Sequence, residues 1–319
     1  MRIAVGIPTL NRPDDVRRTV NSILENTEVP DAIYVADQSD DDRTKNVCEE
    51  LSKNSKGVEV VYLRMDRKGL THARNRILDE VAEKYDVVTF LDHDVVLDKS
   101  YIFEVKNTFK QNPQITGVTG RILNVNLRIL KSSFRAILRG AIDIFLGMFL
   151  PPRVNKYFVN TYPIILPFQK NIMRAQWLSG CNMSYRVSDI TGRRFEEQFI
   201  LYSYGEDLIF SYGLHQEGKK LVLNPRVRLV HLESPAARIT GKAKLLMMLG
   251  YKLYAMAKFR PKEKVNELFK KYVRHTSSSS NKRDIEELMK VIAECKEDIL
   301  RGDLKILNER IIALLHVQT

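Results

Sequence analysis

Two aspartates, Asp92 and Asp94, stand one residue apart directly after the apolar run Val87–Phe90. The run predicts a buried strand, which places the pair at its carboxyl end. Charges at the end of a buried strand need a partner that neutralises them. Hard divalent cations bind carboxylate oxygens and commonly hold substrate phosphates. The pair therefore predicts a Mg²⁺ or Mn²⁺ site for a phosphorylated donor, although Asp-x-Asp also occurs in solvated turns at strand ends.

The elements that position this pair alternate between strands and helices over the first hundred residues. Each expected strand is short and apolar on both faces, which is typical of a parallel sheet covered by helices. The alternation predicts a doubly wound α/β fold. Ligands in such sheets bind at the carboxyl ends of the strands, so we expect Asp37, Arg64 and Asp92 to meet in one crevice. The expected strands are 3–8, 32–36, 58–63 and 87–91, and the expected helices are 13–26, capped by Asn11, 44–51 and 71–85.

The pattern changes after about residue 112. We expect strands at 115–123, 221–223 and 227–232, and a helix beginning near Gly205, where helix-dipole attraction favours Glu206 and Asp207 in the first turn. Segments 134–150 and 243–259 are apolar with basic edges, which suits either helices lying on a membrane or helices packed on the core. A Ser-rich break at 276–281 reads as a flexible linker, and 283–317 as two amphipathic helices separated near Gly302.

Composition narrows the class of protein. The chain has 319 residues and a net charge of +12, and residues 134–259 carry 18 Lys and Arg against 8 Asp and Glu. This regional excess suits phosphates, nucleic acid or an anionic membrane surface. Cys48, Cys181 and Cys295 show no metal-ligand or disulfide spacing, so a reducing compartment fits best. Residues 1–5 read as a strand rather than a signal peptide, and we expect a cytoplasmic protein.

Several motifs together resemble the family 2 inverting glycosyltransferases, which have the nucleotide-diphospho-sugar transferase (GT-A) fold. The resemblance covers roughly residues 1–235 and rests on the order and spacing of its motifs. The matching segments are Gly6–Arg12, Val35–Ser39, Gly69–Asn75, Leu91–Asp94 with its DXD pattern, Trp177–Asn182 and Gly205–Asp207. The resemblance implies a catalytic domain at 1–235, with a nucleotide-binding half at 1–112 and an acceptor-binding half at 113–235. Residues 236–319 would be a helical C-terminal extension.

The resemblance also implies roles for residues around the metal. Asp94 would ligate Mn²⁺ or Mg²⁺, and Asp92 would contact the ribose or share the metal. His231, near the end of a strand, resembles the third metal ligand of the family, while the other interpretation is a buried or capping histidine. A divalent ion stabilises the charge that builds on the leaving phosphate. Asp207 would be the general base that takes the proton of the acceptor hydroxyl, and Glu206 would orient the acceptor or cap the helix.

Donor and acceptor residues follow in the same way. Pro8 and Thr9 would lie along the nucleoside, Asp37 would meet the base or ribose, and Arg74 would approach the diphosphate or Asp92. Arg12 and Lys68 are further donor candidates, although exposed basic residues are usually just solvated. This chain has Asp37-Gln38 where the family often has a second acidic residue, which leaves base recognition open. Acceptor-facing residues would be Trp177, Gly180 and Asn182, with Trp177 either stacking on a sugar or packing in the core. Cys181 would be a small packing residue, because direct displacement needs no covalent step.

The implied activity is transfer of a hexose-type sugar from a UDP-, GDP- or dTDP-linked donor to a glycan or lipid-linked acceptor, as in polysaccharide biosynthesis. A sugar nucleotidyltransferase is the rival enzyme, but residues 8–14 lack the glycines of a triphosphate-binding loop. A basic nucleic-acid-binding protein is the rival outside enzymes, but apolar stretches interrupt the charges of the middle segment. The two basic apolar segments lead us to expect peripheral attachment to the inner face of a membrane with anionic lipids.

Overall fold

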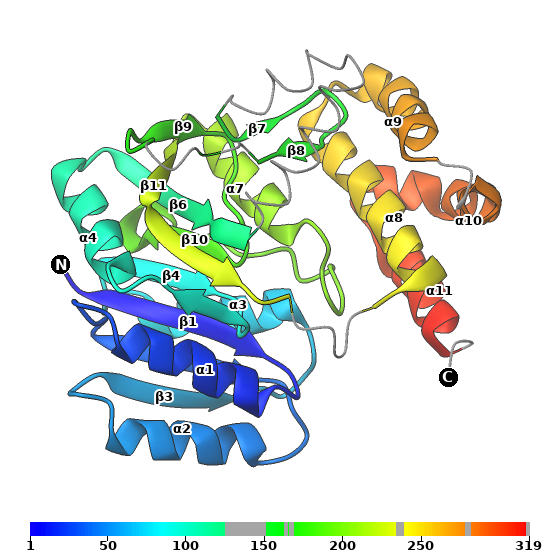
Figure 1. Ribbon diagram of the computed structural model, residues 1–319. Helices are drawn as coiled ribbons and strands as arrows, with labels where there is room; N and C mark the ends of the chain where they lie inside the picture. Colours follow the sequence, from blue (N-terminus) through cyan, green and yellow to red (C-terminus); the bar gives the residue numbers. More distant parts are fainter. Residues whose placement is uncertain (125–150, 163–164, 166–168, 234–238, 278–281, 317–319) are drawn as a thin grey trace.

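The computed structural model describes residues 1–319 except 125–150, 163–164, 166–168, 234–238, 278–281 and 317–319. Strands and helices alternate in the first half of the chain, and the described elements after β11 are all helices (Figure 1). In chain order the elements are β1 (Ile3–Thr9), α1 (Pro13–Leu24), β2 (Ala32–Asp37), α2 (Arg43–Lys53), β3 (Glu59–Arg64), α3 (Leu70–Val81), β4 (Val87–Leu91), β5 (Val95–Leu97), α4 (Tyr101–Gln111), β6 (Ile115–Ile122), β7 (Arg153–Val154), β8 (Asn160–Thr161), β9 (Met173–Ala175), β10 (Asn182–Arg186), a 3₁₀ turn (Val187–Asp189), α7 (Glu206–Gln216), β11 (Lys220–His231), α8 (Gly241–Phe259), α9 (Lys262–Thr276), α10 (Lys282–Arg301) and α11 (Lys305–His316).

A mixed sheet forms the centre of the molecule. Within the described ranges its order is β3-β2-β1-β4-β10-β6-β11-β5, and β9 also pairs with β11. The first four strands of this order are parallel, as predicted, whereas β10 is antiparallel to both β4 and β6. Thr9 pairs with Asp37 across β1 and β2, so the carboxyl ends of these strands lie at one edge of the sheet.

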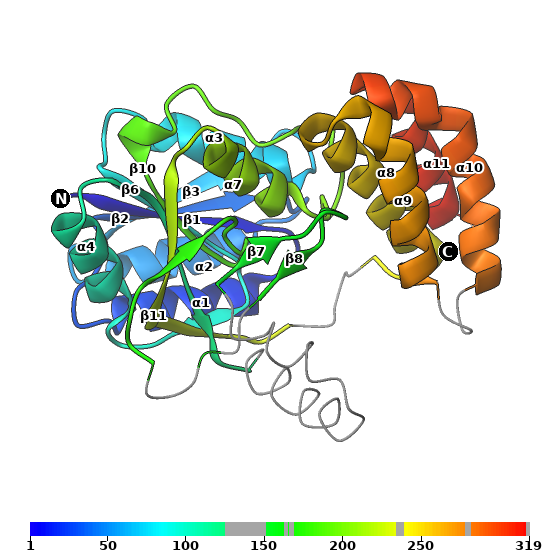
Figure 2. The same ribbon diagram turned by 90° about the horizontal axis from the view of Figure 1, so that it is seen from above.

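Helices cover both faces of the sheet, which confirms the doubly wound arrangement (Figure 2). Residues of α1, α2 and α4 share one core with one face of the central strands, and Val16, Val20 and Ile23 of α1 are fully buried there. Residues of α3 and α7 share the opposite core, to which the sheet contributes smaller residues such as Ala4 and Ala32. The alternation of side chains along each strand supplies both cores.

Most predicted boundaries agree with the structure within a few residues, but the start of α1 differs. Asn11 was expected to cap this helix. Instead Arg12 occupies the N-cap position without a side-chain cap hydrogen bond, and Asn11 has a φ of 55°. Pro13 is the first helical residue, and its fixed φ and missing N–H suit that place.

The two strands predicted at 221–223 and 227–232 form a single strand, β11. Its pairing with β6 is irregular between Asn224 and Arg228, and Pro225, which cannot donate to a ladder, falls within this irregular segment. The bulge brings the carbonyl oxygen of Val227 to 2.1 Å from where a Cβ on Gly120 would lie. Glycine at position 120 therefore permits the close approach that continues the strand to His231.

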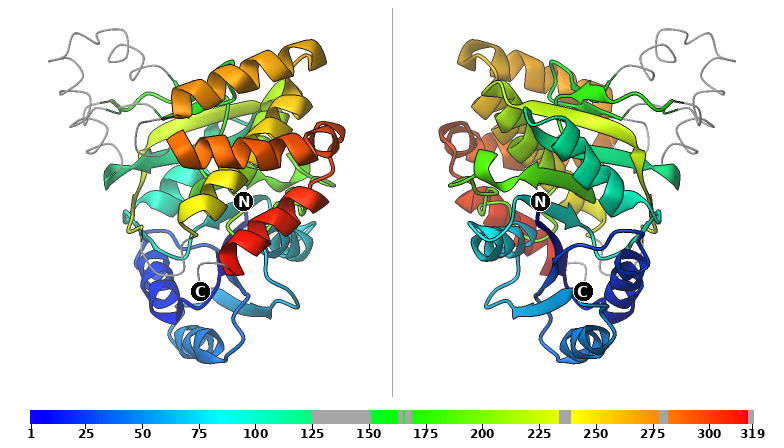
Figure 3. Two further views of the ribbon diagram at one scale, coloured as in Figure 1. Left: turned by 90° about the vertical axis from the view of Figure 1, so that its right-hand side faces the viewer. Right: turned by 90° about the vertical axis from the view of Figure 1, so that its left-hand side faces the viewer.

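The four C-terminal helices pack on one another at one end of the sheet (Figure 3). The prediction of two helices separated near Gly302 is confirmed, because α10 and α11 flank it, whereas α9 was missed. The apolar residues of α8 are covered by its neighbours, so this segment packs on a core and its apolar side is not free for a membrane. The expected membrane segment 134–150 lies outside the described residues, as does most of the expected linker at 276–281. In the part of the chain that is described, every helix is too short or too polar to cross a membrane.

Candidate active site

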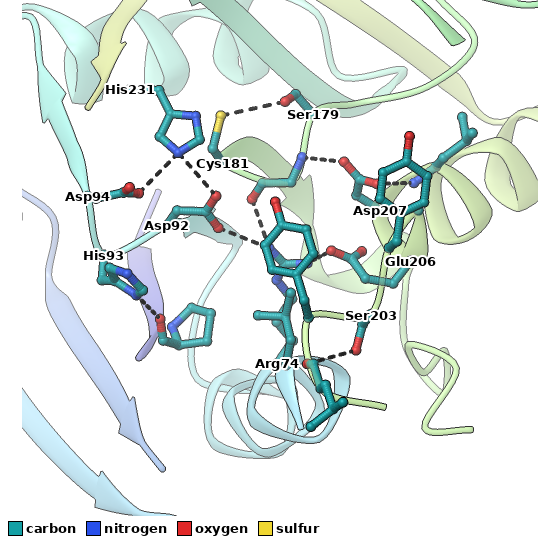
Figure 4. A pocket seen from close by; sticks show the side chains of 18 of the residues that line it. Arg74, Asp92, His93, Asp94, Ser179, Cys181, Ser203, Glu206, Asp207 and His231 are labelled. Atoms are coloured by element: carbon teal, nitrogen blue, oxygen red, sulfur yellow. Dashed lines mark hydrogen bonds and ion pairs between the residues drawn. The ribbon is translucent and has the colours of Figure 1, made fainter. Parts of the chain in front are cut away.

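A cavity of about 530 Å³ opens at the carboxyl ends of β1 and β4. Its walls come from these strand ends, the loop before α3, the turn before β10, the first turn of α7 and the end of β11 (Figure 4). The volume lies in the range of small-molecule sites. The cavity brings together most of the predicted site residues, which are Pro8, Thr9, Arg12, Lys68, Arg74, Asp92, Asp94, Trp177, Gly180, Glu206, Asp207 and His231.

Two carboxylates and an imidazole meet at one side of this cavity. Nε2 of His231 lies 3.0 Å from Oδ1 of Asp94 and 3.8 Å from Oδ2 of Asp92. The β4 end supplies both aspartates and the last residue of β11 supplies the histidine, so segments 137 residues apart build one cluster. Sγ of Cys181 also lies within 4.8 Å of ligand atoms of Asp92 and His231.

The electrostatics of this cluster suit a cation. Burial alone would lower the pKa of His231, but the hydrogen bond to Asp94, the adjacent Cys181 and the nearby Asp92 raise that pKa to about 11. The carboxylates therefore favour positive charge where the imidazole lies. A divalent cation bound by the same oxygens and by Nε2 would supply that charge, and this donor set fits Mn²⁺ or Mg²⁺.

Arg74 of α3 also lines the cavity. It is 1% exposed and forms a buried ion pair with Glu206. Its Nη2 lies 3.3 Å from Oδ1 of Asp92 and 3.0 Å from the carbonyl oxygen of Gly180. The predicted approach of Arg74 to Asp92 is therefore observed. Burial raises the pKa of Glu206, which the positive charge of Arg74 offsets only in part.

Asp207 is held in a fixed orientation at the start of α7. Its Oδ2 accepts a hydrogen bond of 2.7 Å from the backbone N–H of Gly180, and its Oδ1 accepts one of 2.7 Å from the N–H of Leu208. Burial raises the pKa of Asp207, while these two backbone donors counteract the rise. The carboxylate borders the cavity, so it can accept a proton there.

Two predicted residues do not reach the cavity. Asp37 is fully buried, and its carboxylate accepts hydrogen bonds from Ser39 and from the hydroxyl of Tyr62. These hydrogen bonds hold the loop after β2, and contact between Asp37 and a base or ribose stays a prediction. Asn182 is also fully buried, and its Oδ1 accepts a hydrogen bond of 2.6 Å from Tyr101.

Two further basic candidates, the buried Arg12 and the exposed Lys68, line the cavity and already have partners. Arg12 lies 2.9 Å from Asp15, and Lys68 lies 2.8 Å from Asp40. The loop that carries Lys68 is anchored by Gly69, whose N–H donates to Oε1 of Gln38 at 2.6 Å. Gly69 has a φ of 154°, which favours glycine at the residue before α3.

Aromatic residues also line the cavity. Trp177 is only 5% exposed, its indole N–H donates to the carbonyl oxygen of Thr161 at 3.0 Å, and its ring meets Tyr162 edge to face. Trp177 thus packs in a core and also borders the cavity. Tyr162, Tyr202 and Tyr204 line the cavity as well and were missed. No motif marks Tyr162 or Tyr202, whereas Tyr204 directly precedes the Gly205–Asp207 motif.

A further missed residue comes from the C-terminal helices. Lys252 of α8 lines the cavity although it is only 7% exposed, and its Nζ donates to the carbonyl oxygen of Phe158 at 2.6 Å. Burial lowers the pKa of Lys252 to about 8, partly offset by Asp207. The sequence signal for it was one of four lysines in an apolar helix, all of which were expected at its basic edges.

The comparisons with known proteins agree with this fold. The sequence model of Glycosyl transferase family 2 matches residues 4–168, which is about half of the chain. Glycosyltransferase GlyA of Streptococcus pneumoniae is 28% identical over 101 residues, which is 32% of this chain and 14% of that protein. A Bacillus subtilis protein named for teichuronic acid biosynthesis, the glycosyltransferase TuaG, is 29% identical over 92 residues, which is 29% of this chain and 35% of that protein.

A solved structure extends the likeness over the whole chain. Mannosyltransferase PcManGT from Pyrobaculum calidifontis, in complex with GDP-Man and Mn²⁺, superimposes with a TM-score of 0.57 and 12% identity, covering 100% of this chain and 81% of that one. At this identity the likeness concerns the fold. The two curated relatives are matched over well under two thirds of their own lengths.

Proposed function

The chain belongs to glycosyl transferase family 2, and we propose that it transfers a sugar from a nucleotide-diphosphate donor to a hydroxyl group of a glycan or lipid-linked acceptor, with inversion at the anomeric carbon. One observation carries the proposal. The cluster of Asp92, Asp94 and His231 and the carboxylate of Asp207 border the same cavity. A site for a charged leaving group thus lies in one space with a base for the incoming hydroxyl.

The donor would occupy the side of the cavity at the strand ends. Asp92, Asp94 and His231 would hold Mn²⁺ or Mg²⁺, which stabilises charge on the leaving diphosphate. Pro8 and Thr9 line the cavity at the end of β1 and would contact the nucleoside. Arg74 lies within 3.3 Å of Asp92 and would orient that carboxylate towards the cation. The mannosyltransferase complex with GDP-Man and Mn²⁺ supports a nucleotide-sugar donor of this kind.

The acceptor would bind against the aromatic residues that line the cavity, such as Trp177 and Tyr202. Asp207, fixed by Gly180 and Leu208, would take the proton of the hydroxyl as its oxygen attacks the anomeric carbon. Attack opposite the diphosphate inverts the configuration. Glu206 is paired with Arg74 and would position that arginine. Residues 1–235 would form the catalytic domain, in two halves that meet near residue 112, and residues 236–319 an extension that also reaches the cavity through Lys252.

The experiment is a thermal-stability screen with UDP, GDP and dTDP, each with and without Mn²⁺. We expect one of them to stabilise the protein, and only with Mn²⁺, by about 2.7 kcal/mol at a hundredfold excess over its dissociation constant. The matching nucleotide sugars are then tested for transfer, and NMR of the product reports the anomeric configuration. Stabilisation by none of the three diphosphates, with or without metal, contradicts the proposal.

A further inference from the structure

Cys181 stands out because its neighbours are the groups that would hold the cation. It lies between Gly180 and Asn182 at the start of β10, is 5% exposed and lines the cavity. Its Sγ and ligand atoms of Asp92 and His231 all lie within 4.8 Å of one another. Figure 4 shows the sulfur beside the imidazole ring, on the same side as Asp92.

These separations suit a shared ion. Atoms that each lie about 2.0–2.3 Å from one metal lie roughly 3–4.6 Å from each other, so small side-chain adjustments bring all of them into contact with it. Asp94 is outside the group of atoms that all lie within 4.8 Å of one another, but it contacts His231 at 3.0 Å and would join the donor set once its side chain adjusts. The hydroxyl of Ser179 lies 3.5 Å from Sγ. A contact of this length is weak, so it would not compete with a metal ion for the sulfur.

The other two cysteines lie outside the group formed with Asp92 and His231. Cys48 and Cys181 both belong to the core that α1, α2 and α4 share with the sheet, and Cys295 lies among the C-terminal helices. All three cysteines are free and buried, but within the described residues only Cys181 belongs to a group that could hold a metal ion. Cys181 thus packs in the core and also brings its sulfur beside Asp92 and His231.

We propose that Cys181 is a further ligand of the divalent cation, which makes the donor set two carboxylates, one imidazole and one thiolate. The inference rests on the proposed function only in requiring that a cation binds there. On binding, the thiol proton is released to solvent and a metal–sulfur bond forms without any redox change. Because thiolate is a soft ligand, it favours Co²⁺ and Zn²⁺, and to a smaller degree Mn²⁺, over Mg²⁺, so Cys181 would bias the site against Mg²⁺.

The test is a Co²⁺ titration of the reduced full-length protein. Thiolate ligation produces a sulfur-to-cobalt charge-transfer band in the near ultraviolet, which oxygen and nitrogen ligands do not produce. Binding itself is followed by quenching of the single tryptophan, Trp177, which lines the cavity. We expect the band in the wild-type protein and in the Cys48→Ala/Cys295→Ala double variant, in which Cys181 is the remaining cysteine.

Cys181→Ser should still bind Co²⁺, but without the band and at least about tenfold more weakly. Its affinity for Mg²⁺ should change little, because the serine oxygen suits that ion. A melting curve checks that Cys181→Ser folds. If it does not fold, the spectra of the wild-type protein and the double variant still decide whether a thiolate binds Co²⁺. Quenching by Co²⁺ without the band in the wild type, or a band that persists in Cys181→Ser, overturns thiolate ligation and leaves the proposed function standing. If neither Co²⁺ nor Mn²⁺ binds the wild-type protein, with or without a nucleoside diphosphate, the metal site of the proposed function fails as well.

Discussion

The backbone N–H of Gly180 donates a hydrogen bond of 2.7 Å to Oδ2 of Asp207. The same glycine accepts from Nη2 of Arg74 through its carbonyl oxygen. A Cβ at position 180 would lie 3.1 Å from Oδ2 of Asp207 and 3.2 Å from Nη2 of Arg74. The turn before β10 therefore couples the proposed base to the arginine that faces the metal cluster, and a side chain at position 180 would crowd both groups.

Asp207→Asn should abolish transfer while leaving donor binding nearly intact. The amide keeps the shape of the side chain but cannot take a proton, and loss of a general base costs roughly 10²–10⁴-fold in rate. The measurements are the turnover rate and the Mn²⁺-dependent affinity for the nucleoside diphosphate. Asp79→Asn, at an exposed aspartate on α3, is the matched control and should change neither. Loss of donor binding together with turnover would count against Asp207 as the base.

The pH profile of kcat/KM should show an acid limb at higher pH than an ordinary aspartate gives. Burial raises the pKa of Asp207 above 3.8, and the base works only when deprotonated, so activity is lost as pH falls through the raised pKa. Metal loss at low pH would also lower activity, but that limb moves when the Mn²⁺ concentration changes. The prediction is contradicted if the acid limb of kcat/KM moves when the Mn²⁺ concentration changes. It is also contradicted if kcat/KM stays constant down to the pH at which an ordinary aspartate is protonated.

The parts of the site that follow strands could be predicted from sequence. Asp92 and Asp94 follow an apolar run whose strand character fixes where they lie, and the motif around Arg74 opens a helix beside them. Asp37 follows a strand too, but Ser39 and Tyr62 take up its carboxylate. Those partners depend on the path of a loop and on the register of β3, which no periodicity encodes.

The residues that were missed come from segments whose position depends on tertiary packing. Tyr202 lies in a loop where Leu201, Ser203 and Gly205 all have positive φ, a path that propensities do not favour. Lys252 reaches the cavity only because α8 packs against its neighbouring helices. A lysine in an apolar helix looks the same in sequence whether it faces water or a binding cavity.

Lys252→Met should stabilise the protein at neutral pH and impair use of the acceptor. The folded-state pKa of about 8 lies below the ordinary 10.5, so burying the charged form costs stability below pH 8. That cost disappears as pH rises from about 8 to 10.5. After allowing for the lost hydrogen bond to Phe158, we expect a gain of about 1–2 kcal/mol at pH 7 that shrinks towards pH 10.

Melting temperatures of wild type and variant at pH 7 and pH 9.5 provide the measurement, with acceptor KM as the functional readout. Lys258→Met is the matched control, because Lys258 is on the same helix but 45% exposed, and it should show no gain of this size. A gain that does not depend on pH would mean that the buried charge is not its source.

Gly120→Ala should destabilise the protein and weaken metal binding together. The added Cβ would lie 2.1 Å from the carbonyl oxygen and 2.6 Å from Cγ1 of Val227, and backbone cannot move aside as a side-chain end can. We expect a loss of about 1–3 kcal/mol in denaturant unfolding. Because His231 follows Val227 by four residues on β11, a displaced strand moves the imidazole away from Asp94, so Mn²⁺ affinity should fall as well.

Gly213→Ala, in α7, is the control and should not destabilise the protein. A Cβ at position 213 would lie 3.6 Å from its nearest neighbour, and alanine favours a helix over glycine by up to about 1 kcal/mol. If Gly120→Ala unfolds at the wild-type denaturant concentration, the close approach of β6 and β11 does not constrain the strand that carries His231.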